Sequence, residues 1–362
     1  MPIDKNTIAA SGQRLLKFGA AINEALAQEM ERDPSVFVFG LDVDDHKGIQ
    51  GSTLGLVERF GPDRVFGTPL SEDAMTGVAI GAAMAGMRPV HVHIRMDFVM
   101  LCMNQLVNMA AKAHYMWGGQ VQVPMVVRGI IGKSWGQGPQ HSQSLYSMFM
   151  HVPGLKVAVP SNAHDAKGCM IAAIRDNNPV IFVEHRMLYF TEAYVPEQSF
   201  EVPCGKARIV ETGKDITVVG ISHMVHDCLR ARELLADVGI DAEVIDPIWL
   251  KPLDVDTIRE SVKRTGRLLV VDNDWTMCGA SAEILAAVAE WGGMDGRPLQ
   301  MKRMGYAPVV CPTSPPLEKL FYPDPVTVAE AAYRMCRPDG ETWHPSHERA
   351  ELVHQHQFRG PF

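Results

Sequence analysis

Residues 67–94 read GTPLSEDAMTGVAIGAAMAGMRPVHVHI, and this stretch indicates how the first part of the chain folds. Between positions 75 and 87 the only side chains are Ala, Gly, Val, Ile, Met and Thr, which predicts a helix packed closely on all sides. Gly77, Gly81 and Gly86 would let neighbouring backbones approach that helix. The run PVHVHI at 89–94 predicts a strand directly after it.

Glu72 stands just ahead of this run of small residues, separated from it by Asp73 and Ala74. A carboxylate at the mouth of an apolar helix would lose part of its hydration, which favours its protonated form and suits a catalytic proton carrier. The alternative is structural, because acidic residues interact favourably with the N-terminal end of a helix dipole. The spacing alone leaves both interpretations open.

Composition limits the class of protein. The 362 residues are enough for two domains, and 46% apolar with 21% charged residues is typical of a globular protein. The net charge of −8 and the lack of a basic cluster argue against binding to nucleic acid or to a membrane surface. The seven cysteines are scattered, so neither a disulfide framework nor a zinc site is expected. We expect a cytoplasmic protein without a signal peptide or membrane span.

The order of elements predicts an α/β fold with parallel sheets, in which ligands bind at the carboxyl ends of the strands. We expect a first domain over 1–195, a second α/β domain over 205–336, and a polar tail or surface arm over 337–362. The arm contains His344, His347, His354 and His356, and a metal site there is the less favoured alternative. Expected helices cover 14–33, 97–117, 144–151 and 163–175, and expected strands cover 36–43, 124–132, 155–160 and 179–185.

The glycine-rich loop over 132–143 is the strongest local signal, because loops at strand ends carry function disproportionately. It contains His141, a residue type suited to acid–base chemistry, followed by Ser142 and Gln143, which could fix its tautomer. A structural loop histidine is the alternative. The loop also matches GxSxG around Ser134, but no helix follows directly, so a serine hydrolase is not favoured. A nicotinamide dehydrogenase is weakly supported, because no GxGxxG follows a strand.

Four segments follow one another along the chain: TPLSEDAMTGVAIGAAMAG, RMDFVMLCMNQLVNMAAKAHYMWGG, VPMVVRGIIGKSWGQGPQHSQS and AIRDNNPVIF. In this order they resemble segments of the β subunits of thiamine-diphosphate-dependent 2-oxoacid dehydrogenases of the pyruvate, branched-chain and acetoin type. The resemblance extends from about residue 14 to residue 335. It implies a pyrimidine-binding domain followed by a transketolase-like C-terminal domain.

The resemblance implies roles for individual residues. Glu72 matches the carboxylate that hydrogen-bonds the cofactor's aminopyrimidine ring and promotes loss of the thiazolium proton. Phe98 matches the aromatic residue that packs on the pyrimidine, and Ile94 falls in the same cofactor site. His141 matches the histidine of the active-site channel that assists reaction with a lipoyl group.

In many relatives a monovalent cation, potassium, binds to this subunit. Its ligands match Met125, Ala173, Ile174, Asp176 and Asn178 here, and oxygen ligands suit such an ion.

The resemblance also implies a partner. This chain lacks the GDG…N-type motif through which the superfamily holds the cofactor's diphosphate by way of Mg²⁺. An α subunit is therefore expected to supply that half of the site, in an α/β heterotetramer. The chain alone is expected to bind cofactor poorly and to be inactive. A lipoyl-bearing acyltransferase is the expected acyl acceptor.

Some positions depart from the usual pattern. The strand VHVHIRMD carries two histidines and an arginine, Trp135 is bulkier than usual, and Asp272-Asn273-Asp274 replaces a glutamate segment. These departures leave the substrate open. Polar residues expected near the mouth of the site (His91, His93, Arg95 and Arg128) would also suit a split, transketolase-like carboligase. A non-catalytic β-like scaffold is the third alternative.

Overall fold

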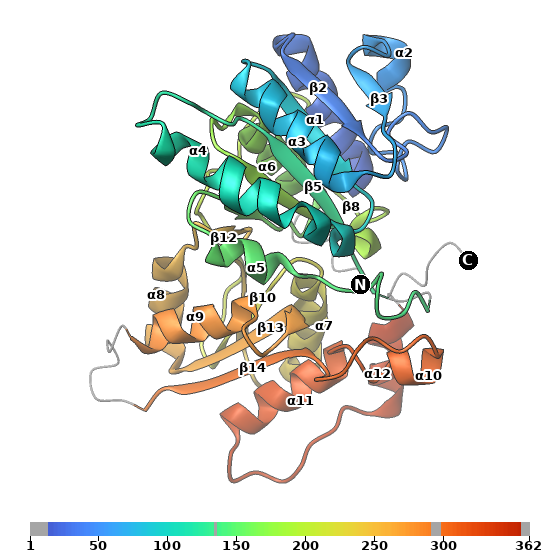
Figure 1. Cartoon of the computed structure of the whole chain (residues 1–362). Coiled ribbons are helices and arrows are strands. Elements are labelled where there is room, and N and C mark those ends of the chain that lie inside the picture. Colours follow the sequence, from blue (N-terminus) through green and yellow to red (C-terminus); the bar gives the residue numbers. More distant parts are fainter. Residues whose placement is uncertain (1–13, 134–135, 291–297, 356–362) are drawn as a thin grey trace.

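The computed structural model describes residues 14–133, 136–290 and 298–355, and it consists of two α/β halves, one above the other in Figure 1. The first half contains a sheet of seven strands in the order β12-β6-β7-β5-β4-β2-β3. All neighbouring pairs are parallel except β12 with β6. The strands are β2 (Val36–Gly40), β3 (Val65–Gly67), β4 (Arg88–His93), β5 (Val126–Ile131), β6 (Lys156–Ala158), β7 (Val180–His185) and β12 (Trp249–Lys251).

Helices cover both faces of this sheet, as a parallel sheet requires. Side chains along β2 alternate between the two hydrophobic cores, because Val36 and Val38 face one core and Phe37 and Phe39 face the other. The first core is closed by α1 (Phe18–Arg32) and α6 (Ala163–Arg175). The second is closed by α3 (Glu72–Met84), a 3₁₀ helix η2 (Met96–Cys102), a π-helix η3 (Asn104–Ala110), α4 (Ala111–Met116) and α5 (Tyr146–His151).

The second half is a five-stranded sheet in the order β14-β13-β10-β11-β9. Its strands are parallel except for β9, and their bounds are β9 (Arg208–Glu211), β10 (Ile216–Gly220), β11 (Ala242–Asp246), β13 (Arg267–Trp275) and β14 (Gln300–Tyr306). The helices α8 (Val255–Thr265) and α9 (Ala280–Ala289) contribute to the core shared with the first half. On the other face lie α7 (Met224–Ala236) and α11 (Pro325–Cys336).

The two halves share a strand. Although β12 follows β11 in the second half of the sequence, it pairs antiparallel with β6 and forms the edge of the first sheet. Trp249 of β12 is 1% exposed and belongs to the core under α1 and α6. The hydrophobic core that contains Phe37 and Phe39 also includes Val219 and Ile245 of the second sheet, so the halves are packed on one another.

Two helix predictions need correction. The single helix expected over 97–117 is three consecutive segments, η2, η3 and α4, with different hydrogen-bond spacing. The helix expected from residue 14 begins only at Phe18, because β1 (Leu15–Lys17) pairs with β8 (Glu192–Tyr194). Short helices α2 (Leu56–Phe60), η4 (Arg186–Leu188) and α10 (Pro315–Glu318) complete the described elements outside the arm.

The prediction that the small-residue helix packs on all sides is wrong for this chain. Thr76, Ala79, Ile80 and Ala83 of α3 are buried, but the opposite face is exposed. Nothing in the described part of the chain lies within 4 Å of a Cβ placed on Gly77 or Gly81, and Val78 between them is 54% exposed.

Residues 337–355 form an arm that packs on the second half. Trp343 stacks on Tyr333 with 5.0 Å between ring centroids, and Arg349 of α12 (His347–Gln355) binds both carboxylate oxygens of Asp237. Among the described residues no group of three or more His, Cys, Asp or Glu side chains is arranged to hold a metal ion. His356 lies outside the described residues. No described helix is both long and apolar enough to cross a membrane.

Candidate active site

A cavity of about 440 Å³ lies at the carboxyl ends of the first sheet's strands. Its walls come from the ends of β2 and β4, from the start of α3, from η2 and from the loop after β5. The lining residues are Leu41, Leu70, Glu72, His93, Ile94, Arg95, Phe98, Leu101 and His141. Every residue expected in the catalytic and pyrimidine-binding set, Glu72, Ile94, Phe98 and His141, is therefore at one place.

The backbone at the end of β2 has little room, and a glycine meets this need. Gly40 has φ of +147°, and a Cβ there would lie 2.3 Å from the carbonyl oxygen of Val92. This close approach holds β2 against β4 directly beside the cavity residue Leu41.

Glu72 is the first residue of α3 and is partly buried. Within the chain its carboxylate faces a wall that is otherwise mainly apolar, with Leu70 and Phe98 among its neighbours in the cavity lining. Glu72 therefore lies both at the N-terminus of α3 and in the cavity wall. A favourable interaction with the helix dipole and a catalytic role are compatible at this position.

Phe98 and His141 come from different elements and meet at the cavity. Their rings are in edge-to-face contact, with centroids 5.4 Å apart and planes at 76°. Phe98 is 37% exposed, which is unusual for a phenylalanine and leaves part of its ring available to a ligand. This contact fixes the histidine ring beside the predicted cofactor site.

Asp97 was missed by the sequence analysis, although it stands next to Phe98. It is 8% exposed and accepts hydrogen bonds from the backbone N–H and the side-chain amide of Gln143, at 3.1 and 2.9 Å. Burial raises the pKa of Asp97, while the bonds from Gln143 and the nearby His141 lower it. Gln143 therefore ties the loop to η2 and does not fix the tautomer of His141 as expected. Ser134 and Trp135 of this loop lie outside the described residues.

Two of the four polar residues expected near the mouth of the site are elsewhere. His91 is 2% exposed, stacks on Phe39 at 4.5 Å and contacts the hydroxyl of Thr76. Arg128 is completely buried in β5. Only His93 and Arg95 line the cavity.

The buried Arg128 is held by Glu184 of β7. Its Nε and Nη2 atoms donate to the two carboxylate oxygens at 2.5 and 2.9 Å, and Tyr189 donates to the same carboxylate. Both charged side chains are fully buried. Burial alone would lower the pKa of Arg128, but the hydrogen-bonded carboxylate of Glu184 raises this pKa above its usual value.

Comparison with known families gives the same result for both halves. Residues 15–191 match the model of the transketolase pyrimidine-binding domain, and residues 205–328 match that of the transketolase C-terminal domain. The β subunit of an acetoin:2,6-dichlorophenolindophenol oxidoreductase from Cupriavidus necator is 45% identical over 90% of this chain and 98% of its own. The chain belongs to the β-subunit family of 2-oxoacid dehydrogenases.

Other members of the family are similar over nearly the same length. A pyruvate dehydrogenase E1 β subunit from Rickettsia bellii is 42% identical over 87% of this chain and 97% of its own. The mitochondrial β-1 subunit from Arabidopsis thaliana is 41% identical over 90% and 91%. A solved split-gene transketolase has the same fold, with a TM-score of 0.72 over 88% of this chain and 98% of its own at 21% identity.

In this β subunit, the segment expected to bind a monovalent cation lies at the end of α6, far from Glu72 in the sequence. The carbonyl oxygens of Ile174 and Asp176 accept hydrogen bonds from Arg88, at 2.8 and 3.0 Å. The Asp176 carboxylate pairs with Lys156 and accepts from the backbone N–H of Asn178. The Met125 carbonyl accepts from the N–H of Val180 at 3.0 Å. Met125 and Ala173 are buried.

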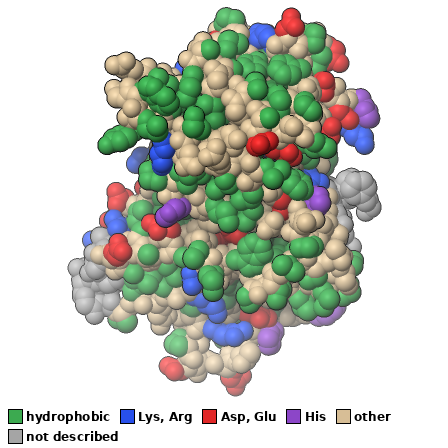
Figure 2. Space-filling view, viewed as in Figure 1, with side chains coloured by type: hydrophobic (Ala, Val, Ile, Leu, Met, Phe, Trp, Pro, Cys, Tyr) green, Lys and Arg blue, Asp and Glu red, His purple; other side chains and the backbone are tan. Residues whose placement is uncertain are grey.

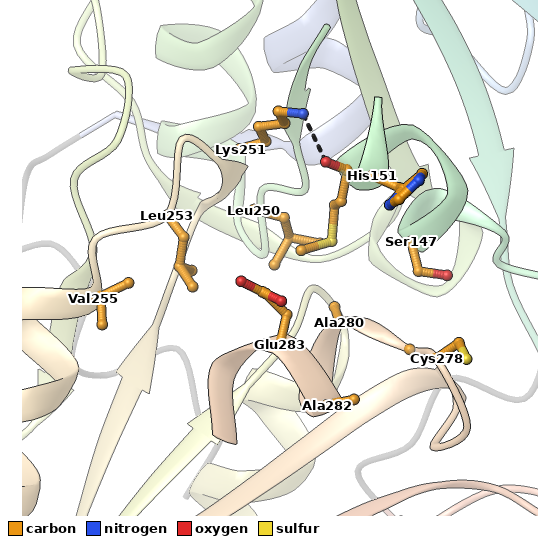
Figure 3. Close-up of a pocket in the computed structure, with 12 residues that line it drawn as sticks. Ser147, His151, Leu250, Lys251, Leu253, Val255, Cys278, Ala280, Ala282 and Glu283 are labelled. Carbon is orange, nitrogen blue, oxygen red and sulfur yellow. Dashed lines mark hydrogen bonds between the residues drawn. The ribbon is translucent and has the colours of Figure 1, made fainter. Parts of the chain in front are cut away.

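A second cavity, of about 470 Å³, lies between the two halves (Figure 3). Ser147 and His151 come from α5, Lys251 from β12, and Glu283, whose carboxylate points into the cavity, from α9. The ammonium group of Lys251 donates hydrogen bonds to the carbonyls of Met150 and Val152. No residue of the Glu72 cavity lines this one, so we assign the chemistry to the former although the latter is slightly larger.

The second half supports the loop that carries His141. Tyr146 and Ser147 begin α5, just after that loop, and donate to Asp272 and Asp274 of β13 respectively. Asp272 also accepts from the backbone N–H of Ser281, at 2.8 Å. Burial raises the pKa of Asp274 to about 7, with Asp272 as a further cause. The departure from the family pattern at 272–274 is thus a set of interdomain contacts.

Proposed function

We propose that the cavity around Glu72 is the β-subunit half of a thiamine-diphosphate site, completed by an α subunit. The observation that carries the proposal is that Glu72, Phe98, Ile94 and His141 line one cavity. Glu72 would hold the pyrimidine ring and share a proton with its nitrogen, Phe98 and Ile94 would pack on the ring, and His141 would serve as an acid or base in the same cavity. When bound, thiamine diphosphate supplies the nucleophilic carbon and the electron sink for loss of CO₂.

The cavity fits that cofactor in its chemistry. A mainly apolar wall with a carboxylate and a half-exposed aromatic ring suits a flat heterocycle that must share a proton. A partly desolvated carboxylate is suited to that proton transfer. The cavity does not contain the diphosphate-binding motif, and we assign diphosphate and Mg²⁺ to the α partner.

An exposed apolar surface starts at the cavity and continues over α3, η2, η3 and α4, and it supports assembly with a partner. Leu70, Val78, Leu101, Met109, Tyr115 and Met116 are all more than 40% exposed. Figure 2 shows hydrophobic side chains over the α4 end of the first half. Exposed apolar surface of this kind marks a protein interface. Because a Cβ on Gly77 or Gly81 would meet nothing within 4 Å in the described residues, a partner helix can approach α3 closely. We therefore propose an α/β heterotetramer.

The acyl acceptor in this proposal is a lipoyl group on an acyltransferase. The aldehyde-level fragment left after loss of CO₂ would be oxidised to an acyl group as it bonds to one lipoyl sulfur and the S–S bond breaks. His141 would supply the proton to the other sulfur, which leaves as a thiolate and becomes a thiol. The carboligase alternative loses support, because His91 and Arg128, two of the four residues cited for it, lie in the protein core.

The chain purified alone should not decarboxylate 2-oxo acids, whereas the chain co-purified with its α partner should do so with thiamine diphosphate and Mg²⁺. Turnover is measured by CO₂ release and by reduction of an artificial electron acceptor over a panel of 2-oxo acids. Full activity of the single chain would disprove the shared site. Carbon–carbon bond formation without net oxidation, in a complex that binds cofactor, would favour the carboligase.

We also propose that K⁺ binds at the end of α6, where Ala173 and Ile174 present helix-terminal carbonyls beside Asp176 and Asn178. Saturating K⁺ at about 100 times its Kd should stabilise the fold by about 2.7 kcal/mol, or roughly 3–4 °C in Tm for a chain of this length. The measurement is thermal unfolding in KCl against tetramethylammonium chloride at equal ionic strength. Equal Tm values in the two salts would refute the site, and Asn178→Ala should reduce the difference.

A further inference from the structure

The wall of the active-site cavity formed by the end of β4 differs from the rest. Leu41, Leu70, Phe98 and Leu101 make most of the lining apolar, and Glu72 and His141 are explained by the cofactor chemistry proposed above. His93 and Arg95 are two further polar residues in the wall, and neither has a role in that chemistry.

His93 is buried with an unused polar atom. It is 2% exposed, and its Nε2 has no hydrogen-bond partner among the described residues. Burial lowers its pKa to about 4, so the ring is neutral at pH 7. Its ring lies 4.2 Å from that of His91, which is itself fixed by Phe39 and Thr76. Since residues two apart on a strand share a face, His93 lies on the face that α3 and η2 cover, where the cavity is.

Arg95 brings a positive charge without a carboxylate partner. Its Nη1 donates to the carbonyl of Ile94 at 2.9 Å, but among the described residues it makes no ion pair. Its Nε–H is buried and donates to no partner within that same part of the chain. Asp97 is nearby, but its Oδ1 already accepts two hydrogen bonds from Gln143. Burial lowers the pKa of Arg95, an effect that Asp97 and Tyr189 oppose.

The surroundings add further positive charge. Arg186 is 1% exposed and close enough for Arg95 to help lower its pKa, which burial and this repulsion bring to about 10. Arg186 is occupied, because it donates to the carbonyls of Gly132 and Lys133 and to Gln137. A guanidinium beside a second one, with spare donors and low hydration, is well suited to an anion.

We propose that Arg95, assisted by His93, binds an acidic group at the far end of the substrate, so that the preferred 2-oxo acid carries a second anion. This inference rests on the proposed function. The 2-oxo carboxylate itself is a poor partner, because its charge is lost as CO₂ leaves. An ion pair with it would stabilise the reactant more than the transition state and would slow the reaction. A second anion keeps its charge throughout, so its binding does not oppose the reaction.

The test uses the co-purified α/β complex and three 2-oxo acids of equal length that end in methyl, carboxylate or phosphate. The wild type should prefer an acid-ended substrate in kcat/KM, and the carboxylate and phosphate arms identify which anion. Arg95→Met should reduce kcat/KM for that substrate by about 10- to 100-fold, mainly through KM, since a hydrogen bond to a charged group is lost. The methyl-ended substrate should change less than about 3-fold. His93→Phe should give a smaller loss of the same selectivity.

Controls separate this inference from its foundation. Arg59→Met, at an exposed ion pair on α2, should leave all three substrates unchanged. Unselective loss in Arg95→Met, or wild-type preference for the methyl-ended acid, overturns the inference while the proposed function stands. If no 2-oxo acid is turned over, the proposed function fails. The anion site can then still be tested by measuring the binding of the non-reacting 2-hydroxy analogues. Tighter binding of the acid-ended analogue that disappears in Arg95→Met supports the anion site, and equal binding refutes it.

Discussion

Replacing Glu72 by Gln should reduce decarboxylation by the assembled α/β complex by about 100- to 10,000-fold, the usual contribution of a positioned proton carrier. The amide keeps the shape of the side chain at the start of α3 but cannot share a proton with a ring nitrogen. Cofactor binding should weaken by no more than a few fold, because Phe98 and Ile94 still line the cavity. Steady-state rates and cofactor titration by fluorescence measure the two effects.

Asp73→Asn is the matched control. Asp73 follows Glu72 on the same turn of α3 but is exposed and does not line the cavity. The Asp73→Asn substitution removes one negative charge from the same helix N-terminus, as Glu72→Gln does. Any effect of the helix dipole is therefore common to both variants. More than a tenth of the wild-type rate in Glu72→Gln, or an equal loss in Asp73→Asn, would contradict the assignment.

Replacing Glu184 by Gln should lower the free energy of unfolding by about 3–5 kcal/mol, because it leaves the charge of Arg128 buried without its partner. Tyr189 donates a hydrogen bond to Glu184, and Arg128 donates one to Ser52. Both hydrogen bonds should weaken when the ion pair is lost. Urea denaturation followed by circular dichroism measures the change.

Glu31→Gln provides the comparison for this second variant. Its ion pair with Arg59 is exposed, at 54% and 49% for the two side chains, and exposed pairs contribute roughly 0–1 kcal/mol. A loss of stability in Glu184→Gln no larger than that in Glu31→Gln would show that the buried pair is not important to the fold.

Much of the site could be predicted because its residues follow short, local patterns. The α/β alternation predicts that ligands bind at the carboxyl ends of the strands, and the family resemblance assigns Glu72, Phe98 and His141 to one cofactor site. The pairing of Arg128 with Glu184 could not be predicted in this way. The two residues are not even opposite in the sheet, since Arg128 faces Phe182. A charged residue in each of two apolar strands is the only sign of it.

Which side chains line the cavity was equally hard to predict. His91 and His93 share a face of β4, but Phe39 and Thr76 cover the first, while the second lies at the end of the strand where the cavity opens. The helix expected over 97–117 contains neither Gly nor Pro between 96 and 116, so no local signal marks its changes of geometry. η2 and η3 pack against α3, and η2 also packs against β5, so contacts outside the segment accompany those changes.

The strand β12 has a consequence for how this family can be rearranged. Residues 249–251 belong to the second half of the sequence, yet they complete an edge of the sheet that carries the cofactor site. A chimera joined in the linker near residue 200 would therefore replace part of the first half as well, taking Trp249 from a different parent than the core it fills. Recombination among relatives is constrained to joints that keep 249–251 together with β6.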